Sequence, residues 1–542
     1  MGRRTSHVSL ALKVPCTHDT AKRHELAFYS ASHQQPQYIN AEMSCCTAAG
    51  RVAARQALRR GLNAASARRW NSTTTKGTAQ AAQGSGPMTF LLSGVVGAAA
   101  GVGAYFYTSH SSNGAKTSSA SASEVVPSIA QALSEKGIAV ESPVKPLDLR
   151  AVDIKLRRQA QTFTFESRGG KVGRVDVVRV PSNDPVEDDW SVGVGEGVGG
   201  KKTLFAGVYD GHAGWATSMV LRKALIPYVS TSIAELDETS TDEMIDAAIK
   251  DAFDRLDHRI MANAKDLVDA GADPASADVI AALAPVTAGS CAILSMYEPA
   301  TSTVRTACTG DSRAVLGSWS AKQKTHAAEA LSQDQTGFNK AEFDRITREH
   351  PGEDGILDPN TGRLLGIAIT RAFGDHRWKW SLEFLEHLKG NYFDVGPRPK
   401  YLSPPYMTAT PEVTTRRVET SDFVILASDG LWDHMTNDDA VACVSRWLAA
   451  QRAGGRAEPV ADETETKLQT SGGWASWSSR PEDFAIEDMD SAAVCLVKNA
   501  FGGRRRGLLR GVVSAEGPGS RYARDDVTVQ VIFFDDPYNG KK

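Results

Sequence analysis

The stretch 205-FAGVYDGHAGWATS-218 places Asp210-Gly211-His212 directly after a run of apolar residues. An apolar run that ends in Asp-Gly is typical of a β-strand followed by a tight turn. A carboxylate at the end of a buried strand is also a suitable ligand for a hard metal ion. Asp210 is therefore either a turn residue or a metal ligand, and this stretch alone does not separate the two.

Other carboxylates occupy the same kind of position, between a strand-like run and a turn. They are Glu187 and Asp188 in PVEDDW, Asp311 in CTGDSR, Asp429 and Asp433 in ASDGLWD, and Asp525 and Asp526 in ARDDVTV. A single Asp-Gly is more often a turn, but carboxylates gathered at neighbouring strand ends repel one another strongly. Such a cluster normally holds cations, so the repeated pattern favours a metal site.

The residue types in this pattern indicate both the metal and the reaction. Oxygen ligands with no cysteine and little histidine favour Mg²⁺ or Mn²⁺ over zinc or copper. Two such ions about 3.5–4 Å apart share a bridging carboxylate and activate a water for attack on a phosphorus atom. The leaving oxygen then needs a proton, for which His212 is the candidate general acid and His434 the alternative. We favour His212 because it flanks Asp210.

From about residue 150 onward, β-rich runs alternate with amphipathic helical stretches. TLFAGVYD and DFVILASD are expected strands, and 302–319 is expected to be two strands joined in a hairpin through Gly310-Asp311-Ser312. Residues 241–268 and 436–451 are expected helices, the first with Met244, Ala248, Phe253 and Leu256 near one side. This pattern favours antiparallel sheets covered by helices over a Rossmann array.

Composition excludes several classes of protein. A net charge of −3 over 542 residues argues against nucleic-acid binding held by bulk charge. The seven cysteines are dispersed and form no CxxC, so they predict neither a disulfide framework nor a zinc site. The GxGxxG match at Gly195, Gly197 and Gly200 is not followed directly by a helix, so it is interpreted as a hairpin loop.

The motifs VEDDW, FAGVYDGHAGWATS, TAGSCAIL, ACTGDSRAVLG, TRAFGDHRWK, VILASDGLWD and RDDVTVQVIFF follow one another in the chain. In this order they resemble the signatures of the metal-dependent type 2C protein Ser/Thr phosphatases, over roughly residues 155–536. The resemblance implies an enzyme of the α/β (α+β) class. Its core would be a central antiparallel β-sandwich flanked by pairs of antiparallel helices, with a binuclear Mn²⁺/Mg²⁺ site at one edge.

The resemblance also implies roles for individual residues. Asp210 would bridge both ions, and the Gly211 carbonyl would bind the second. Asp429 and Asp525 would ligate the first ion, and His212 would be the general acid.

The remaining acidic residues receive secondary roles from the same resemblance. Glu187 and Asp188 would act mostly through metal-bound waters. Asp311 and Asp433, with help from Asp429, would form a weaker third metal site, and Asp375 in AFGD is expected to be structural.

One position departs from the family pattern. Most members carry an arginine four residues before the acidic Glu to grip the substrate phosphate, and here that position is Asn183. A neutral amide cannot make the bidentate contact of a guanidinium. Asn183, together with PPYMTATPEV and AAVCLVKNAFGG, resembles the pyruvate dehydrogenase phosphatase branch, so phosphate binding is expected to lean on the metals and on a substrate-docking surface.

Residues 1–87 are expected to be a targeting region that is largely disordered. No Asp or Glu occurs between Met43 and Ser123, and arginines at 51, 55 and 59 share one helical face, as in a mitochondrial presequence over 43–77. A disordered basic tail is the alternative. Asp19, Glu25 and Glu42 do not fit a presequence, so we interpret 1–42 as an extension of the gene model.

Residues 88–107 are uncharged and long enough to cross a bilayer core of ~30 Å, so a single transmembrane helix is favoured over a presequence-linked segment. A Ser-rich linker and lead-in, 108–150, precede the expected catalytic domain, 151–542. A span used as an inner-membrane anchor would place that domain in the intermembrane space. Without one, the matrix is the expected compartment.

Two questions stay open at this stage. The polar insertion 453–490 is either a disordered surface loop or a partner-docking element. The favoured function is a mitochondrial phosphatase acting on a phosphoprotein substrate, with the pyruvate dehydrogenase complex as candidate partner. The alternatives are a catalytically inactive phosphoprotein-binding scaffold, a phosphatase of intermembrane-space proteins, and a metal-dependent phosphodiesterase or nuclease. Near-neutral charge and no basic-aromatic groove argue against the last.

Overall fold

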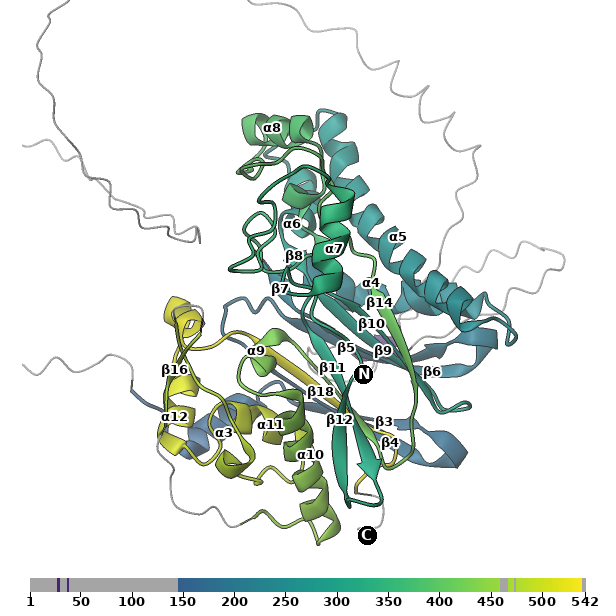
Figure 1. Cartoon of the computed structure of the whole chain (residues 1–542), viewed down its shortest axis with the longest axis vertical. Helices are drawn as coiled ribbons and strands as arrows, with labels where there is room; N and C mark the ends of the chain where they lie inside the picture. The colour runs from purple at the N-terminus through teal and green to yellow at the C-terminus, as the bar shows by residue number, and fades with distance from the viewer. Residues whose placement is uncertain (1–26, 30–36, 39–144, 459–465, 472–473, 539–542) are drawn as a thin grey trace, which may run out of the picture. The chain divides into compact units, whose positions relative to one another are not determined.

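The structure, a computed structural model, describes residues 27–29, 37–38, 145–458, 466–471 and 474–538 (Figure 1). Two antiparallel sheets dominate these residues. One has the order β14-β10-β9-β6-β5-β1-β2 and the other β12-β11-β15-β18-β4-β3. The strands of the first sheet are β14 (Glu412–Arg417), β10 (Thr303–Thr309), β9 (Ala292–Glu298), β6 (Lys202–Tyr209), β5 (Asp189–Glu196), β1 (Ala27–Tyr29) and β2 (Gln37–Tyr38). Those of the second are β12 (Thr325–Ala330), β11 (Arg313–Ser320), β15 (Phe423–Ala427), β18 (Val527–Phe533), β4 (Val172–Val180) and β3 (Gln161–Glu166).

The central strands are apolar at nearly every position because both of their faces are buried. In β6, Leu204, Ala206 and Val208 pack between the two sheets, whereas Phe205 and Tyr209 belong to the cluster under the helices of the first sheet. The strand β15 divides its side chains in the same way between the sandwich interior and the helices of the second sheet. Each sheet is therefore held on two sides, which makes the strand ends rigid supports for a site.

Helices cover the outer faces of the sandwich (Figure 1). The helix α4 (Ala216–Ala234) packs on β5 and β6 and contacts α5 (Asp242–Asp269), which in turn contacts α6 (Ala277–Thr287). On the other face, α10 (Asn437–Arg452), α11 (Ala492–Ala500), α12 (Arg506–Ser514) and α3 (Leu149–Arg157) supply apolar residues to the second helix–sheet cluster. The remaining helices are α7 (Lys340–Glu349), α8 (Leu382–Asn391) and α9 (Asp429–Trp432).

The predicted fold class of antiparallel sheets flanked by helices is confirmed. The GxGxxG segment is the turn of the β5–β6 hairpin, as expected. The predicted hairpin through Gly310-Asp311-Ser312 is wrong, because β10 pairs with β9 and β14 whereas β11 pairs with β12 and β15 of the other sheet. The turn signal was real, but it leads the chain from one sheet to the other.

The helix expected at 241–268 is α5, but its predicted buried face is partly wrong. Met244 is 51% exposed, and the buried residues run from Ile245 through Ile249 and Phe253 to Ile260. Isoleucines one position further along the helix therefore belong to the core cluster, which rotates the buried stripe away from Met244.

The insertion 453–490 packs into the core over its second half. Trp477 is 5% exposed, Phe484 2% and Ile486 0%, and all three belong to the cluster under α10 and α11. The Trp477 ring donates its Nε1–H to the Ala500 carbonyl at 2.8 Å. Residues 469–471 and 474–476 form the short strands β16 (Gln469–Ser471) and β17 (Trp474–Ser476).

The expected presequence 43–77 and the expected span 88–107 lie outside the described residues. Within the described part of the chain, no helix combines the length and apolar character that a membrane crossing needs. Two further segments, β1 and β2, come from the region interpreted as a gene-model extension, and β1 pairs with β5.

If the second half of the insertion belongs to the core, then Trp477→Ala should lower the free energy of unfolding by about 3–5 kcal/mol, the usual cost of deleting a buried tryptophan. Urea denaturation followed by circular dichroism would measure the loss. Leu468→Ala is the matched control, because Leu468 lies in the same insertion and is 61% exposed. Equal stability of the two variants would contradict a core role for this segment.

Candidate metal centre

The acidic loops meet at one end of the sandwich because the strand registers align their ends. Asp189 at the start of β5 pairs with Tyr209 at the end of β6, and Thr309 at the end of β10 pairs with Ala292 at the start of β9. In the second sheet, Ala427 at the end of β15 pairs with both Arg313 and Val529. Segments far apart in sequence thus end beside one another.

Asp210, Asp311 and Asp429 form the centre of this edge. Each offers a carboxylate oxygen, and these atoms all lie within 4.8 Å of one another. The Asp429 backbone N–H donates to Asp210 Oδ2 at 3.3 Å, and the Cys291 thiol donates to Asp311 Oδ1 at 3.2 Å. Three carboxylates from three connections therefore share one small volume.

The pKa values of the carboxyl groups at this edge are raised because the groups are buried and close to one another. Burial raises the pKa of Asp311 to about 7, with the charge of Asp429 adding to the effect. Burial raises the pKa of Asp188 to about 8, and Asp526 contributes next. Burial and then the charge of Asp429 raise the pKa of Asp210 well above its usual range. A hard divalent cation would relieve both the burial cost and the repulsion, so the donor set fits Mg²⁺ or Mn²⁺.

Gly211 occupies a position that no larger residue could fill. A Cβ there would lie 2.2 Å from the Glu187 carbonyl oxygen and 3.0 Å from Ser218 Oγ. Glycine therefore lets the turn after β6 close against the loop that carries Glu187.

Glu187 and Asp188 reach the same edge through a loop that Asp526 organises. Asp526 Oδ2 accepts the backbone N–H of Glu187 at 2.8 Å, and its Oδ1 accepts that of Asn183 at 3.0 Å. Glu187 itself accepts the Gly214 N–H at 2.7 Å and the Asn183 side-chain amide at 3.0 Å. The structure thus gives Asp526 an organising position that the sequence analysis left unassigned.

His212 is bonded to Asp375, with 2.7 Å between Nε2 and Oδ2. Burial by itself would lower the pKa of His212, but the charge and hydrogen bond of Asp375 outweigh it and raise that pKa. Asp375 is 2% exposed, in a left-handed backbone conformation with φ of 53°. Gly289 leaves room for the pair, since a Cβ there would lie 2.2 Å from His212 Nε2.

His434 is held in the core. Its ring stacks on Trp477 with 4.0 Å between centroids, and its Nδ1–H donates to the Trp477 carbonyl. Burial lowers the pKa of His434 to about 4. These contacts favour a packing role for His434 and leave His212 as the stronger candidate acid.

Two other expected ligands, Asp433 and Asp525, are not among the three carboxylates that come together in the described part of the chain. Asp433 follows α9, its backbone N–H donating to the Asp429 carbonyl, and Asp525 immediately precedes Asp526 and β18. Arg521, which the sequence analysis did not single out, forms an ion pair with Asp525. The one signal for it in the sequence is its spacing of four residues before Asp525.

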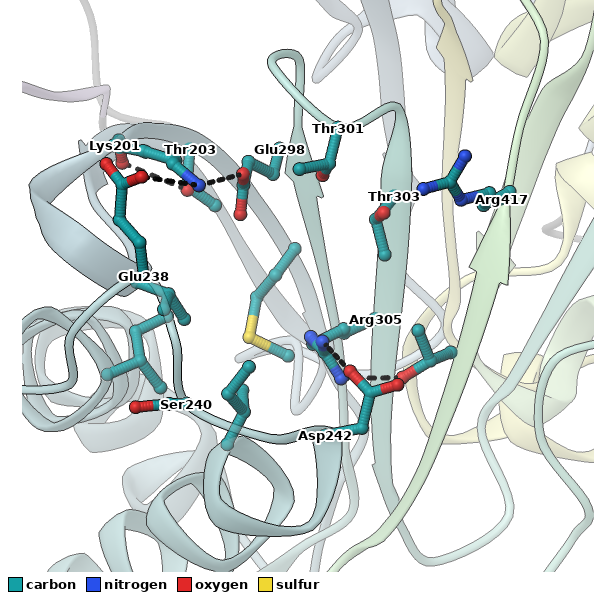
Figure 2. Close-up of a pocket in the computed structure, with 15 residues that line it drawn as sticks. Lys201, Thr203, Glu238, Ser240, Asp242, Glu298, Thr301, Thr303, Arg305 and Arg417 are labelled. Atoms are coloured by element: carbon teal, nitrogen blue, oxygen red, sulfur yellow. Dashed lines mark hydrogen bonds and ion pairs between the residues drawn. The ribbon is translucent and has the colours of Figure 1, made fainter.

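The cavity drawn in Figure 2, about 360 Å³, lies away from these acids. Thr203, which lines it, is at the start of β6, roughly 23 Å from Asp210 just beyond the strand's other end. Lys201 pairs with Glu298 at 3.4 Å, and Arg305 pairs with Asp242 (Figure 2). The cavity is therefore a separate, internally neutralised feature.

Comparison with known proteins identifies the family of this chain. The family profile described as protein phosphatase 2C matches residues 193–472. A protein phosphatase 2C homologue of Schizosaccharomyces pombe is 36% identical, covering 72% of this chain and 87% of its own. The mitochondrial [pyruvate dehydrogenase [acetyl-transferring]]-phosphatase 1 of Saccharomyces cerevisiae is 34% identical over 71% and 72% of the two chains. The human protein of the same name is 28% identical over 66% and 77%.

The chain belongs to the protein phosphatase 2C family and is a protein serine/threonine phosphatase. Within this metal-dependent family it lies near the pyruvate dehydrogenase phosphatase branch.

Cation binding should stabilise the protein more at high pH than at low pH. Because the folded pKa values of Asp188 and Asp311 are raised, the metal-free fold loses stability as pH rises from about 4 toward 8. Saturating Mn²⁺ should therefore raise Tm more at pH 8 than at pH 6. At a cation concentration 100 times Kd, binding adds about 2.7 kcal/mol to the free energy of unfolding. Scanning calorimetry with Mn²⁺ or a chelator measures this, and equal Tm values in both would contradict a cation site.

Proposed function

We propose that this phosphatase hydrolyses phosphoserine and phosphothreonine at the acidic edge of the sandwich and that pyruvate dehydrogenase is its substrate. The observation that carries the catalytic part is the convergence of Asp210, Asp311 and Asp429 within 4.8 Å. The relatives named as mitochondrial pyruvate dehydrogenase phosphatases support the substrate and a mitochondrial location.

The ligands proposed for the cations are Asp210, the Gly211 carbonyl, Asp429 and Asp525, with Glu187, Asp188, Asp311 and Asp433 around them. Divalent cations held there would polarise the phosphate and activate a water for attack on phosphorus. Gly211 admits this arrangement because its turn closes directly on the Glu187 loop. The proposed cations are Mn²⁺ or Mg²⁺, two at the main site and a weaker third at Asp311 and Asp433.

His212 would protonate the serine or threonine oxygen as it leaves. Asp375 would orient the imidazole and stabilise its protonated form, since Asp375 raises the pKa of His212 against the opposing effect of burial. A raised pKa keeps the acid protonated at higher pH, as a proton donor requires.

Asp210→Asn should abolish Mn²⁺-dependent release of phosphate from phosphorylated pyruvate dehydrogenase. A loss of at least about a hundredfold in kcat is expected, because even outer partners of metal sites cost 10–100-fold. Asp237→Asn, an exposed carboxylate in the turn after α4, is the control and should retain activity. Full activity in Asp210→Asn would overturn the mechanism. Wild-type protein inactive with Mn²⁺ and Mg²⁺ would favour the phosphoprotein-binding scaffold.

A pyruvate dehydrogenase phosphatase has to meet its substrate in the matrix. Protease added to mitoplasts with an intact inner membrane should therefore leave the catalytic domain undigested until detergent is added. Digestion without detergent would place the domain in the intermembrane space, refute the proposed substrate, and favour a phosphatase of proteins in that compartment. A matrix marker and an intermembrane-space marker serve as controls.

A further inference from the structure

The turn that carries Arg521 lies beside the loop that carries Asn183. The Ser520 hydroxyl donates to the Ser182 carbonyl, and Asp526 accepts the backbone N–H groups of Ser182 and Asn183. Residues on both sides of Arg521 thus hold the chain at positions 182 and 183. The 3₁₀ turn Gly517–Tyr522 is thus hydrogen-bonded to a loop more than 300 residues earlier in the sequence.

The positive charge of Arg521 acts on several of the expected site carboxylates. Arg521 forms an ion pair with Asp525, and its side chain is 41% exposed. Burial raises the pKa of Asp429 and of Glu187, and in each case the charge of Arg521 is the largest effect in the opposite direction. One cation from this turn therefore acts on acids from two distant segments as well as on Asp525 just after the turn.

Asn183 cannot take this part. Its side-chain amide donates to Glu187 Oε2 at 3.0 Å, so it is already engaged in holding the loop. An amide also lacks the charge that favours a phosphate.

We propose that Arg521 binds the substrate phosphate, supplying from the turn before β18 the guanidinium that position 183 lacks. A guanidinium has five N–H donors, so contact with Asp525 leaves others for phosphate oxygens. Its exposure makes it accessible to a phosphorylated side chain entering from solvent. This inference rests on the proposed phosphoester hydrolysis at the acidic edge.

The test measures phosphate affinity separately from catalysis. Arg521→Ala should raise KM for a phosphopeptide and Ki for inorganic phosphate by about tenfold to a hundredfold, the range of hydrogen bonds to charged groups. Arg521→Lys should fall between Arg521→Ala and wild type, because it keeps the charge without the fork. The rise in Tm that inorganic phosphate causes with saturating Mg²⁺ should shrink in parallel. Arg168→Ala, an exposed arginine whose ion pair with Glu419 is 4.0 Å long, is the control.

The decisive variant is the double substitution Arg521→Ala with Asn183→Arg. The proposal requires a guanidinium near position 183, whether it comes from residue 521 or from residue 183. The double variant should therefore recover most of the phosphate affinity that Arg521→Ala loses. The inference is overturned by an unchanged Ki for inorganic phosphate in Arg521→Ala, or by a defect that disappears when Mn²⁺ is raised, which would show an effect on metal affinity alone. Failure of the proposed function is distinct, because Asp210→Asn would then keep full activity.

Discussion

Electrostatic repulsion among Asp210, Asp311 and Asp429 is the constraint around which the active end of this protein is built. Their carboxylate oxygens lie within 4.8 Å of one another, and burial raises the pKa of each carboxyl group. Such an arrangement costs stability unless a cation compensates it. The protein therefore has to hold these groups together by its scaffold, and that requirement explains the buried strands and hydrogen-bonded loops around them.

The scaffold meets this requirement in two ways. The central strands bury both faces, one between the sheets and one under helices, so their ends cannot splay apart. Beyond the strands, Asp526 fixes the loop of Glu187 through backbone N–H groups, and Gly211 lets the neighbouring turn close on that loop. A carboxylate that organises this loop thus lies next in sequence to Asp525, a proposed ligand.

Charge around the centre is balanced by groups from distant segments. Asp375 holds His212 and raises its pKa, and Arg521 opposes the rise in pKa that burial gives Asp429 and Glu187. The inferred phosphate contact of Arg521 would let one side chain balance the acids and recognise substrate. With asparagine at position 183, Arg521 would supply the guanidinium instead. The hydrogen bond from Ser520 to Ser182 keeps the Arg521 turn beside position 183.

The sequence by itself determined the strands that end in acids, the two longer helices and the class of the fold, because these depend on local periodicity and residue chemistry. It also pointed to Asp210, Asp311 and Asp429, the three carboxylates that the structure brings together. Only the tertiary structure decided which strands pair. Gly310-Asp311-Ser312 carries a local turn signal, but long-range pairing places β10 and β11 in different sheets. Packing likewise buried Trp477 against His434, and it brought Asp375 to His212 across 163 positions of sequence. Turn propensity and side-chain type act over a few residues, whereas partner choice, burial and charge balance are set by the whole fold.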